Sequence, residues 1–298
     1  MSDSYYGKPI VRPHIWGWYI DVYFWLGGLA GAGAVAMACA RMRGAHKLAN
    51  AEKRAALAAI ALAGPLLIVD LGRPARFYNM LRVFKPTSPM SVGTWIFSAY
   101  GAALGGSTLA ELLGWRRTQY AGEALAGLVG PALATYTAAL VADTATPAWH
   151  EAHDVLPFLF ASSAVAAAGS AGVAFAPLAE SGSARRLMIG GALAMVGVGG
   201  IMETRLGPLL AEPYHTGRAG ALQRATNTLA LTGAVLGLLG RRSRTVSTIA
   251  AACVAAAGMC ERFTVLAAGK QSALDPKYTV EPQRARMAAR EKAQPPAA

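Results

Sequence analysis

Acidic and basic side chains stand beside the apolar stretches of this chain, and every second stretch ends in ionisable groups. Such groups at membrane depth are costly and usually face a bundle interior or water, where they can pass protons. The simpler alternative places each of them at a lipid headgroup. Because these groups end alternate stretches, they would lie on the same side of the membrane, which favours a functional site there. The groups are Asp70, Asp143, the neighbours Glu203 and Arg205, and the neighbours Glu261 and Arg262.

The histidines limit the chemistry that this layer of charges can perform. A haem held between helices needs histidines within apolar stretches as axial ligands. Here all of them fall at stretch ends or in loops, so we expect no haem. His150 and His153 could share a helix face, but two imidazoles are a weak metal signal and a solvated loop is the better interpretation. The histidines are His14, His46, His150, His153 and His215.

The apolar stretches that carry these groups are long enough to cross a bilayer. Apolar residues make up 54% of the chain and charged residues 15%, too apolar for a typical soluble domain. Buried helices of a large soluble protein would need polar faces, and a stretch such as "AALAAIALAGPLLIV" has none. The sequence therefore predicts an all-α polytopic membrane protein with about eight transmembrane helices in two four-helix bundles. The predicted spans are residues 16–40, 55–71, 92–113, 124–141, 155–176, 187–202, 225–239 and 248–268.

Basic residues predict the orientation of these spans. Residues 41–54, 114–123, 177–186 and 240–247 together hold twelve Lys and Arg, against nine on the opposite face before the C-terminal tail. The positive-inside rule then places both termini outside. Basic residues in the loops of membrane proteins are the commonest cause of a positive net charge such as the +12 of this chain. We therefore expect no nucleic-acid partner. The ionisable layer lies on the outer face in this orientation.

One polar segment between two apolar stretches is longer than a turn requires. It reads "VDLGRPARFYNMLRVFKPTSPMSVGTW", residues 69–95. Gly72 and Pro74 are typical of a helix end, and Pro86 and Pro89 hold the chain extended before the next helix. Irregular backbone persists at membrane depth only where protein covers it or where it lines a polar cavity. We expect this segment to form the rim of a site or a docking surface.

The chain divides into a membrane domain, residues 1–268, and a polar C-terminal tail, residues 269–298. The prolines and mixed charge of the tail predict an extended arm that lies on a partner outside the membrane and is ordered by binding. The cysteines show no CxxC spacing, so we expect ordinary thiols rather than a disulfide or an iron–sulfur site. They are Cys39, Cys253 and Cys260.

Several motifs together resemble the polysulfide-reductase/NrfD-type family of membrane subunits. They are "WGWYIDVYFWLGGLAGAG", "DLGRPARF…KPTSPMSVGTW", "ATYTAALVADTATPAWHEAHDVLPFLFASSA" and, towards the end of the chain, "ERFTVLAAGKQSA". The resemblance implies a quinone-reactive anchor in the inner or plasma membrane, with both termini and the site on the extracytoplasmic side. It also implies a ferredoxin-like iron–sulfur subunit and a molybdopterin catalytic subunit as partners, with no haem or cluster in the anchor itself.

The resemblance also assigns candidate roles to individual residues. Tyr136 matches the family's fourth-helix tyrosine that holds the quinone headgroup, and Asp143 lies roughly 10 Å further along the helix. An ordinary packed tyrosine is the alternative. His14 and Asp21 are candidates for the other side of the quinone slot.

The remaining candidates carry protons, balance charge or meet partners. Asp70, Asp143 and Glu203 could relay protons, or Asp70 and Glu203 could pair with nearby arginines, and Arg262 could balance these carboxylates. The expected rim and docking residues are Arg76, Lys85, Thr87, Ser88 and Trp95.

Two other functions fit the same residues less well. A stand-alone polytopic transporter with an outward-facing charged site would also need helix breaks and intramembrane charge, but transporters place their charges near the midplane. A purely structural anchor would have no influence on quinone-linked activity of the complex. The sequence leaves open whether the quinone is menaquinone or ubiquinone, the substrate of the catalytic partner and the direction of electron flow.

Overall fold

The computed structural model describes residues 9–12 and 16–293, and this part of the chain is helical, with no strand. Eight of its helices are at least 20 residues long, and each overlaps one predicted span. They are α1 (Trp18–Met42), α2 (His46–Asp70), α4 (Pro89–Leu112), α5 (Arg116–Ala142), α7 (Leu156–Phe175), α8 (Gly182–His215), α9 (Gly217–Leu239) and α10 (Arg244–Leu274). The all-α prediction is confirmed.

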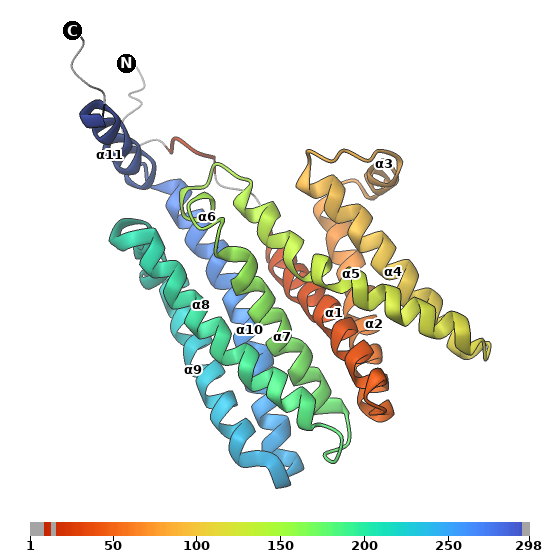
Figure 1. The fold of residues 1–298 in the computed structure, drawn as a ribbon. Helices are drawn as coiled ribbons and strands as arrows, with labels where there is room; N and C mark the ends of the chain where they lie inside the picture. The colour runs from red at the N-terminus through yellow and green to blue at the C-terminus, as the bar shows by residue number, and fades with distance from the viewer. Residues whose placement is uncertain (1–8, 13–15, 294–298) are drawn as a thin grey trace.

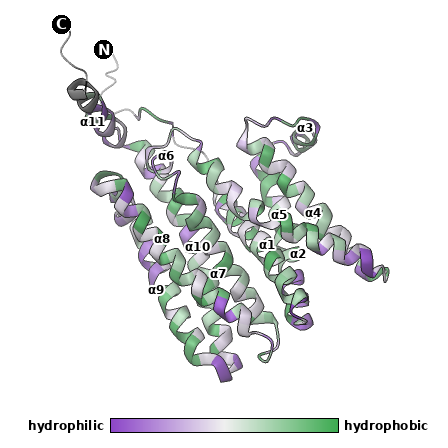
Figure 2. Ribbon diagram, in the orientation of Figure 1, coloured by the Kyte–Doolittle hydropathy of each residue, from purple (hydrophilic) through white to green (hydrophobic). Residues whose placement is uncertain are grey.

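Five of these helices, α1, α5, α7, α8 and α10, are long and apolar enough to cross a membrane. A sixth span is added if α2 is counted with the short helices that follow it at a bend of 110°. Hydrophobic residues run along most of the helix lengths, and hydrophilic residues gather mainly towards the helix ends (Figure 2). The chain is a multi-pass membrane protein, whereas eight crossings and the N-out, C-out orientation stay predictions.

The long helices pack in two groups of four (Figure 1). Helices α1, α2, α4 and α5 form the first bundle, and α7, α8, α9 and α10 form the second. The bundles meet mainly where α1 and α5 pack against α7, and where α1 packs against α10. We call the end that carries α3, α6 and α11 the upper end, and the end where α1 turns into α2 the lower end.

Small residues let these helices approach closely. A Cβ atom added to Gly31 of α1 would lie 2.4 Å from the carbonyl oxygen of Gly130 on α5, so neither position admits a side chain. Gly191 of α8 meets the backbone of Ala166 on α7 in the same way. Close backbone approach at small residues is the usual basis of helix association in membranes, where hydrophobic burial between helices gives little.

Several helices extend beyond their predicted bounds because polar residues continue them, namely α2, α5, α8, α9 and α10. Helix α2 begins at His46 rather than at residue 55, since Glu52 and Lys53 are buried in the first bundle and not in a solvated loop. Helix α8 runs from Gly182 to His215, well beyond the predicted 187–202, and changes direction at Gly207, whose φ of 70° suits glycine.

The upper end carries short elements that the sequence interpretation did not predict. After α2, the chain forms a 3-10 turn (Pro74–Arg76) and α3 (Phe77–Arg82) before α4, and α6 (Pro147–His150) follows α5. Gly72, with a φ of 64°, ends α2 at the predicted place.

The prediction of an extended arm after residue 268 is wrong. Helix α10 continues to Leu274, and Lys277–Ala293 form a further helix, α11. Ion pairs hold α11 to the upper end: Lys277 lies 2.8 Å from Glu212 of α8, and Arg286 lies 2.5 Å from Glu151 after α6. These contacts within the chain tie the tail to the upper end of the molecule.

Candidate functional site

Two tyrosine hydroxyls meet at the upper end of the first bundle. Tyr136 on α5 and Tyr23 on α1 are hydrogen-bonded to each other through their OH groups. A Cβ atom on Gly93 of α4 would lie 2.2 Å from the Tyr136 ring, so glycine at this position makes the room that the ring occupies. Helices α1, α4 and α5 therefore fix the tyrosine that the sequence singled out.

A small cavity lies beside the two hydroxyls. Its volume is ≈ 30 Å³, about the share of one water molecule in the liquid. Asp70, the last residue of α2, lines it together with Tyr23, Tyr136 and Thr94. Asp70 is hydrogen-bonded to Tyr19 of α1. The structure thus brings Asp70 and Tyr136 together as two of the predicted site residues.

A larger hollow, open to the surface, also lies beside Tyr136. Its volume is ≈ 320 Å³, and Tyr136 shares its wall with Asp143 and Thr87. Pro86 and Pro89, from the segment between α3 and α4, complete part of the wall. Tyr136 therefore borders both an inner, water-sized cavity and an open outer hollow large enough for a ring. Asp143, the exposed C-cap residue of α5, stands at the outer side.

The segment before α4 is a structured rim. Ser88 caps α4 by accepting a hydrogen bond from the backbone N–H of Ser91 at 3.4 Å. The Ser91 hydroxyl in turn accepts from the backbone N–H of Lys85 at 3.0 Å. The Trp95 indole donates to the carbonyl of Val83 at 3.4 Å. Ser88 and Trp95 thus shape the rim, and Thr87 lines the cavity that the rim encloses.

Helix α11 covers a third cavity at the upper end. This cavity of ≈ 450 Å³ lies between α6 and α11, with Asp143, His150 and Arg286 in its wall. Beside it, the hydrogen bond from Lys277 to Glu212 raises the pKa of the Lys277 ammonium group. The exposed side chains of Arg76 and Lys85 lie at the same end of the molecule and add positive charge to its upper face.

The other two predicted quinone contacts are not brought to Tyr136 by the described part of the chain. His14 lies outside the described residues. Asp21 is buried in the first turn of α1 but lines neither cavity next to Tyr136. Its charged neighbours are Arg218 of α9 and Lys270 of α10, so it faces the second bundle.

Glu203 and Arg262 have partners other than those considered from the sequence. Glu203 lies within α8, not at a helix end, and contacts Gln223 at 3.2 Å and His215 at 3.3 Å. Arg262 is buried in α10, where it pairs with its neighbour Glu261 at 2.5 Å and stacks over the Phe160 ring at 3.6 Å. Arg262 therefore balances Glu261, and the expectation that it balances Asp70 or Glu203 is wrong.

A second set of buried charges lies at the lower end, and the sequence interpretation missed it. Lys53 of α2 contacts Glu123 of α5 at 3.0 Å and Glu111 of α4 at 2.7 Å. Arg41 of α1 holds the same Glu123 through two hydrogen bonds of 2.9 and 3.0 Å. Charged residues of the lower end are therefore not only solvated anchors. The i, i+4 pair of Gln119 and Glu123 was the signal in the sequence that a helix continued through this region.

Comparison with known proteins gives one family. The family described as "Polysulphide reductase, NrfD" matches residues 10–202, about two thirds of the chain. The matched part includes the whole first bundle, the rim segment, both cavities at Tyr136 and most of α8. No curated protein matches the chain at a significant level.

Proposed function

Because the chain belongs to the polysulphide reductase, NrfD family, we propose that it is the membrane anchor subunit of a respiratory oxidoreductase complex. In this proposal it exchanges electrons between the quinone pool of the membrane and an iron–sulfur subunit that docks on its upper face. A molybdopterin subunit of the same complex holds the catalytic centre. The membrane is the inner or plasma membrane, and the upper face is extracytoplasmic.

The observation that carries the proposal is that Tyr136 lines both the small inner cavity and the open outer hollow. The outer cavity, ≈ 320 Å³, falls within the ~300–1,000 Å³ typical of small-molecule sites, whereas the inner one accommodates only about one water. We therefore assign the quinone ring to the outer cavity, where the Tyr136 hydroxyl is the donor to one quinone oxygen. Tyr23 supports this role because its hydroxyl fixes the orientation of the Tyr136 hydroxyl.

Proton transfer accompanies the electrons, since the conversion of a quinol to a quinone releases two protons with two electrons. Asp70 at the inner cavity and Asp143 at the outer cavity are the carboxyl groups on either side of Tyr136. A general acid or base must lie within hydrogen-bond reach of its proton, directly or through one water. The inner cavity has room for such a water between Asp70 and the tyrosines. Asp143 is exposed and gives the outer cavity a route to the surface.

The upper face has the features that a cluster-bearing partner needs. The rim segment and α3 stand above the outer cavity, and the exposed Arg76 and Lys85 offer charges for docking an acidic surface. Helix α11 lies on the same face, over α6. A cluster in a subunit seated here would come close to a quinone beside Tyr136.

Isolation of the native complex tests this proposal. Affinity purification in a mild detergent should recover the chain with a cluster-bearing subunit, seen as an iron–sulfur signal by electron paramagnetic resonance. The chain stripped of its partners should show neither this signal nor a haem Soret band. A chain that purifies alone from its native membrane would instead favour the transporter, and a stoichiometric b-type haem would make it a cytochrome.

A further inference from the structure

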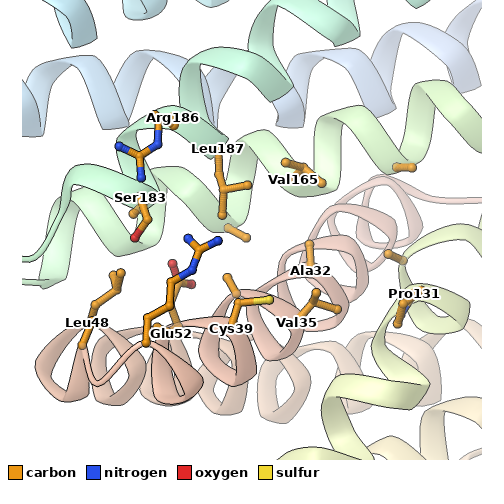
Figure 3. Close-up of a pocket in the computed structure, with 18 of the residues that line it drawn as sticks. Ala32, Val35, Cys39, Leu48, Glu52, Pro131, Val165, Ser183, Arg186 and Leu187 are labelled. Carbon is orange, nitrogen blue, oxygen red and sulfur yellow. The ribbon is translucent and has the colours of Figure 1, made fainter.

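A groove at the lower end is separate from the quinone site. It has a volume of ≈ 390 Å³ and lies between the bundles, among α1, α2, α5, α7 and α8 (Figure 3). It shares no lining residue with either cavity at Tyr136. Its volume is within the ~300–1,000 Å³ typical of ligand sites.

The walls of the groove fit a hydrocarbon chain. Small and aliphatic side chains dominate them, among them Ala32, Val35, Val165 and Leu187. Along α1 the groove extends from Arg43 to Ala32, roughly 16 Å at ~1.5 Å per residue. That length is about half of the ~30 Å hydrocarbon core of a bilayer. The groove therefore has the depth of one leaflet.

A buried carboxyl group without a partner reaches into this apolar space. Glu52 is 1% exposed, and neither of its carboxyl oxygens has a hydrogen-bond partner in the described part of the chain. A Cβ atom on Gly172 of α7 would lie 2.3 Å from one of these oxygens, so glycine there makes room for the carboxyl. An isolated buried carboxylate is so unfavourable that the group takes up a proton instead. The protonated carboxyl group of Glu52 can therefore donate a hydrogen bond to a ligand in the groove.

Two arginines stand at the mouth of the groove. Arg43, at the end of α1, and Arg186, in the first turn of α8, line it from both bundles, with Ser183 next to Arg186. Figure 3 shows Arg186 and Ser183 on the side facing Glu52. Both arginines are exposed and have no ion pair among the residues that the structure describes. The mouth therefore attracts an anion.

We propose that this groove binds one anionic phospholipid of the surrounding membrane. Its phosphate lies between the guanidinium groups of Arg43 and Arg186, which form charge-assisted hydrogen bonds with phosphate oxygens. One acyl chain follows the apolar walls towards Ala32. The glycerol ester carbonyls, which lie below the phosphate in such a lipid, accept a hydrogen bond from the protonated Glu52. The lipid then joins the two bundles at the end of the molecule opposite the quinone site.

Native mass spectrometry of the full chain, released from detergent, tests this proposal with two lipid probes. These are phosphatidylglycerol and phosphatidylcholine with the same acyl chains. We expect one phosphatidylglycerol per chain, bound in preference to phosphatidylcholine. The double variant Arg43→Gln/Arg186→Gln should weaken phosphatidylglycerol binding roughly tenfold or more, because two charge-assisted contacts are lost. Its matched control is Arg116→Gln/Arg117→Gln, which removes two exposed charges from the same end outside the groove and should leave binding unchanged.

Variants of Glu52 test the role of its carboxyl group. Glu52→Gln keeps a neutral hydrogen-bond donor and should retain phosphatidylglycerol, whereas Glu52→Leu removes the donor and should weaken binding. Equal phosphatidylglycerol binding by wild type and the double arginine variant would overturn the proposal. An equal loss in Glu52→Gln and Glu52→Leu would also overturn it, since an ionised carboxylate would then be needed. The arginine test stands even if Glu52→Leu fails to fold, and neither test depends on quinone turnover.

Discussion

The two ends of the first bundle both contain polar groups within an apolar protein, but they use them differently. At the lower end, Lys53, Arg41 and Glu123 saturate one another through short ion pairs and hydrogen bonds from three helices. At the upper end, Tyr136 and Asp70 border cavities, and each has few protein partners. A buried charge that is fully paired holds helices together, whereas a polar group beside an open space is available to a ligand.

The comparison has an energetic basis. Removing one partner of a buried ion pair leaves an uncompensated charge and costs about 3–5 kcal/mol. A lost hydrogen bond to a ligand costs only ~0.5–1.5 kcal/mol and leaves the fold intact. Variants of the lower ion pairs should therefore act on stability, and variants of Tyr136 and its surroundings should act on turnover.

The largest effect is expected for Lys53→Met at the lower end. This change leaves Glu111 without its 2.7 Å partner and Glu123 with Arg41 and Gln119 alone. The free energy of unfolding should fall by about 1–3 kcal/mol, seen in thermal or denaturant unfolding of the detergent-solubilised chain, because Glu123 keeps two of its partners. Quinone turnover per folded molecule should not change.

Lys47→Met is the matched control, since Lys47 lies on the same helix with an exposed side chain. Its stability should stay near that of the wild type. A Lys53→Met protein as stable as this control would show that the lower ion pairs do not hold the bundle together.

Gly93→Ala should disturb the upper end by displacing Tyr136. The added Cβ atom would lie 2.2 Å from the Tyr136 ring, so the ring must move. Misplacement of a contact group by about 1 Å can cost a hundredfold in rate, and we expect quinone-linked turnover to fall roughly tenfold to a hundredfold. Turnover of the complex with a soluble artificial dye reports the catalytic subunit alone and should remain.

Gly101→Ala, on the same helix, is the control for this steric effect. No heavy atom of another residue lies within 4 Å of a Cβ atom at Gly101, so the change should be silent. Unaltered quinone turnover in Gly93→Ala would mean that the position of Tyr136 does not matter to the reaction.

Removal of residues 275–298 should have the smallest effect on the chain itself. The pairs of Lys277 with Glu212 and of Arg286 with Glu151 are exposed to solvent, and such pairs add little to stability. The truncated chain should insert and unfold like the full chain but release the cluster subunit from isolated membranes. Retention of the whole complex would show that α11 covers the upper end without serving the partner.

The hydropathy of the sequence predicted every long helix. Of the predicted site residues, the structure brings Tyr136 together with Asp70, Asp143 and Thr87 but not with Asp21. The sequence interpretation did not predict the lower ion pairs. Their residues lie at the edges of apolar stretches and look like loop charges, and the partners of Lys53 come from helices far away in the sequence. Pairing across such distances is set by tertiary packing, which hydropathy does not report.

The predictions for Arg262 and for the C-terminal tail failed because contacts within the folded chain decided both. Arg262 was expected to serve distant carboxylates, but its partner is the adjacent Glu261, because both side chains are buried together between the bundles. The tail was expected to be extended from its composition, and contacts with α8 and with Glu151 make it a helix. Composition reports the preference of a free segment, not the contacts that override it.

The central claim is that the Tyr136 hydroxyl contacts the quinone, and Tyr136→Phe tests it most directly. The change keeps the ring that Gly93 accommodates but removes the hydroxyl. Tyr120→Phe, an exposed tyrosine at the lower end of the same helix α5, is a suitable control. Tyr100 is not, because its buried hydroxyl is hydrogen-bonded to the carbonyl of Ala30.

In the assembled complex, quinone-linked and dye-linked turnover should be measured side by side for both variants. We predict that Tyr136→Phe lowers quinone-linked turnover roughly tenfold, the kinetic equivalent of ~1.4 kcal/mol, while dye-linked turnover and complex assembly stay unchanged. Tyr120→Phe should be silent in both assays. Equal quinone-linked turnover in wild type and Tyr136→Phe would contradict the assignment and place the quinone elsewhere.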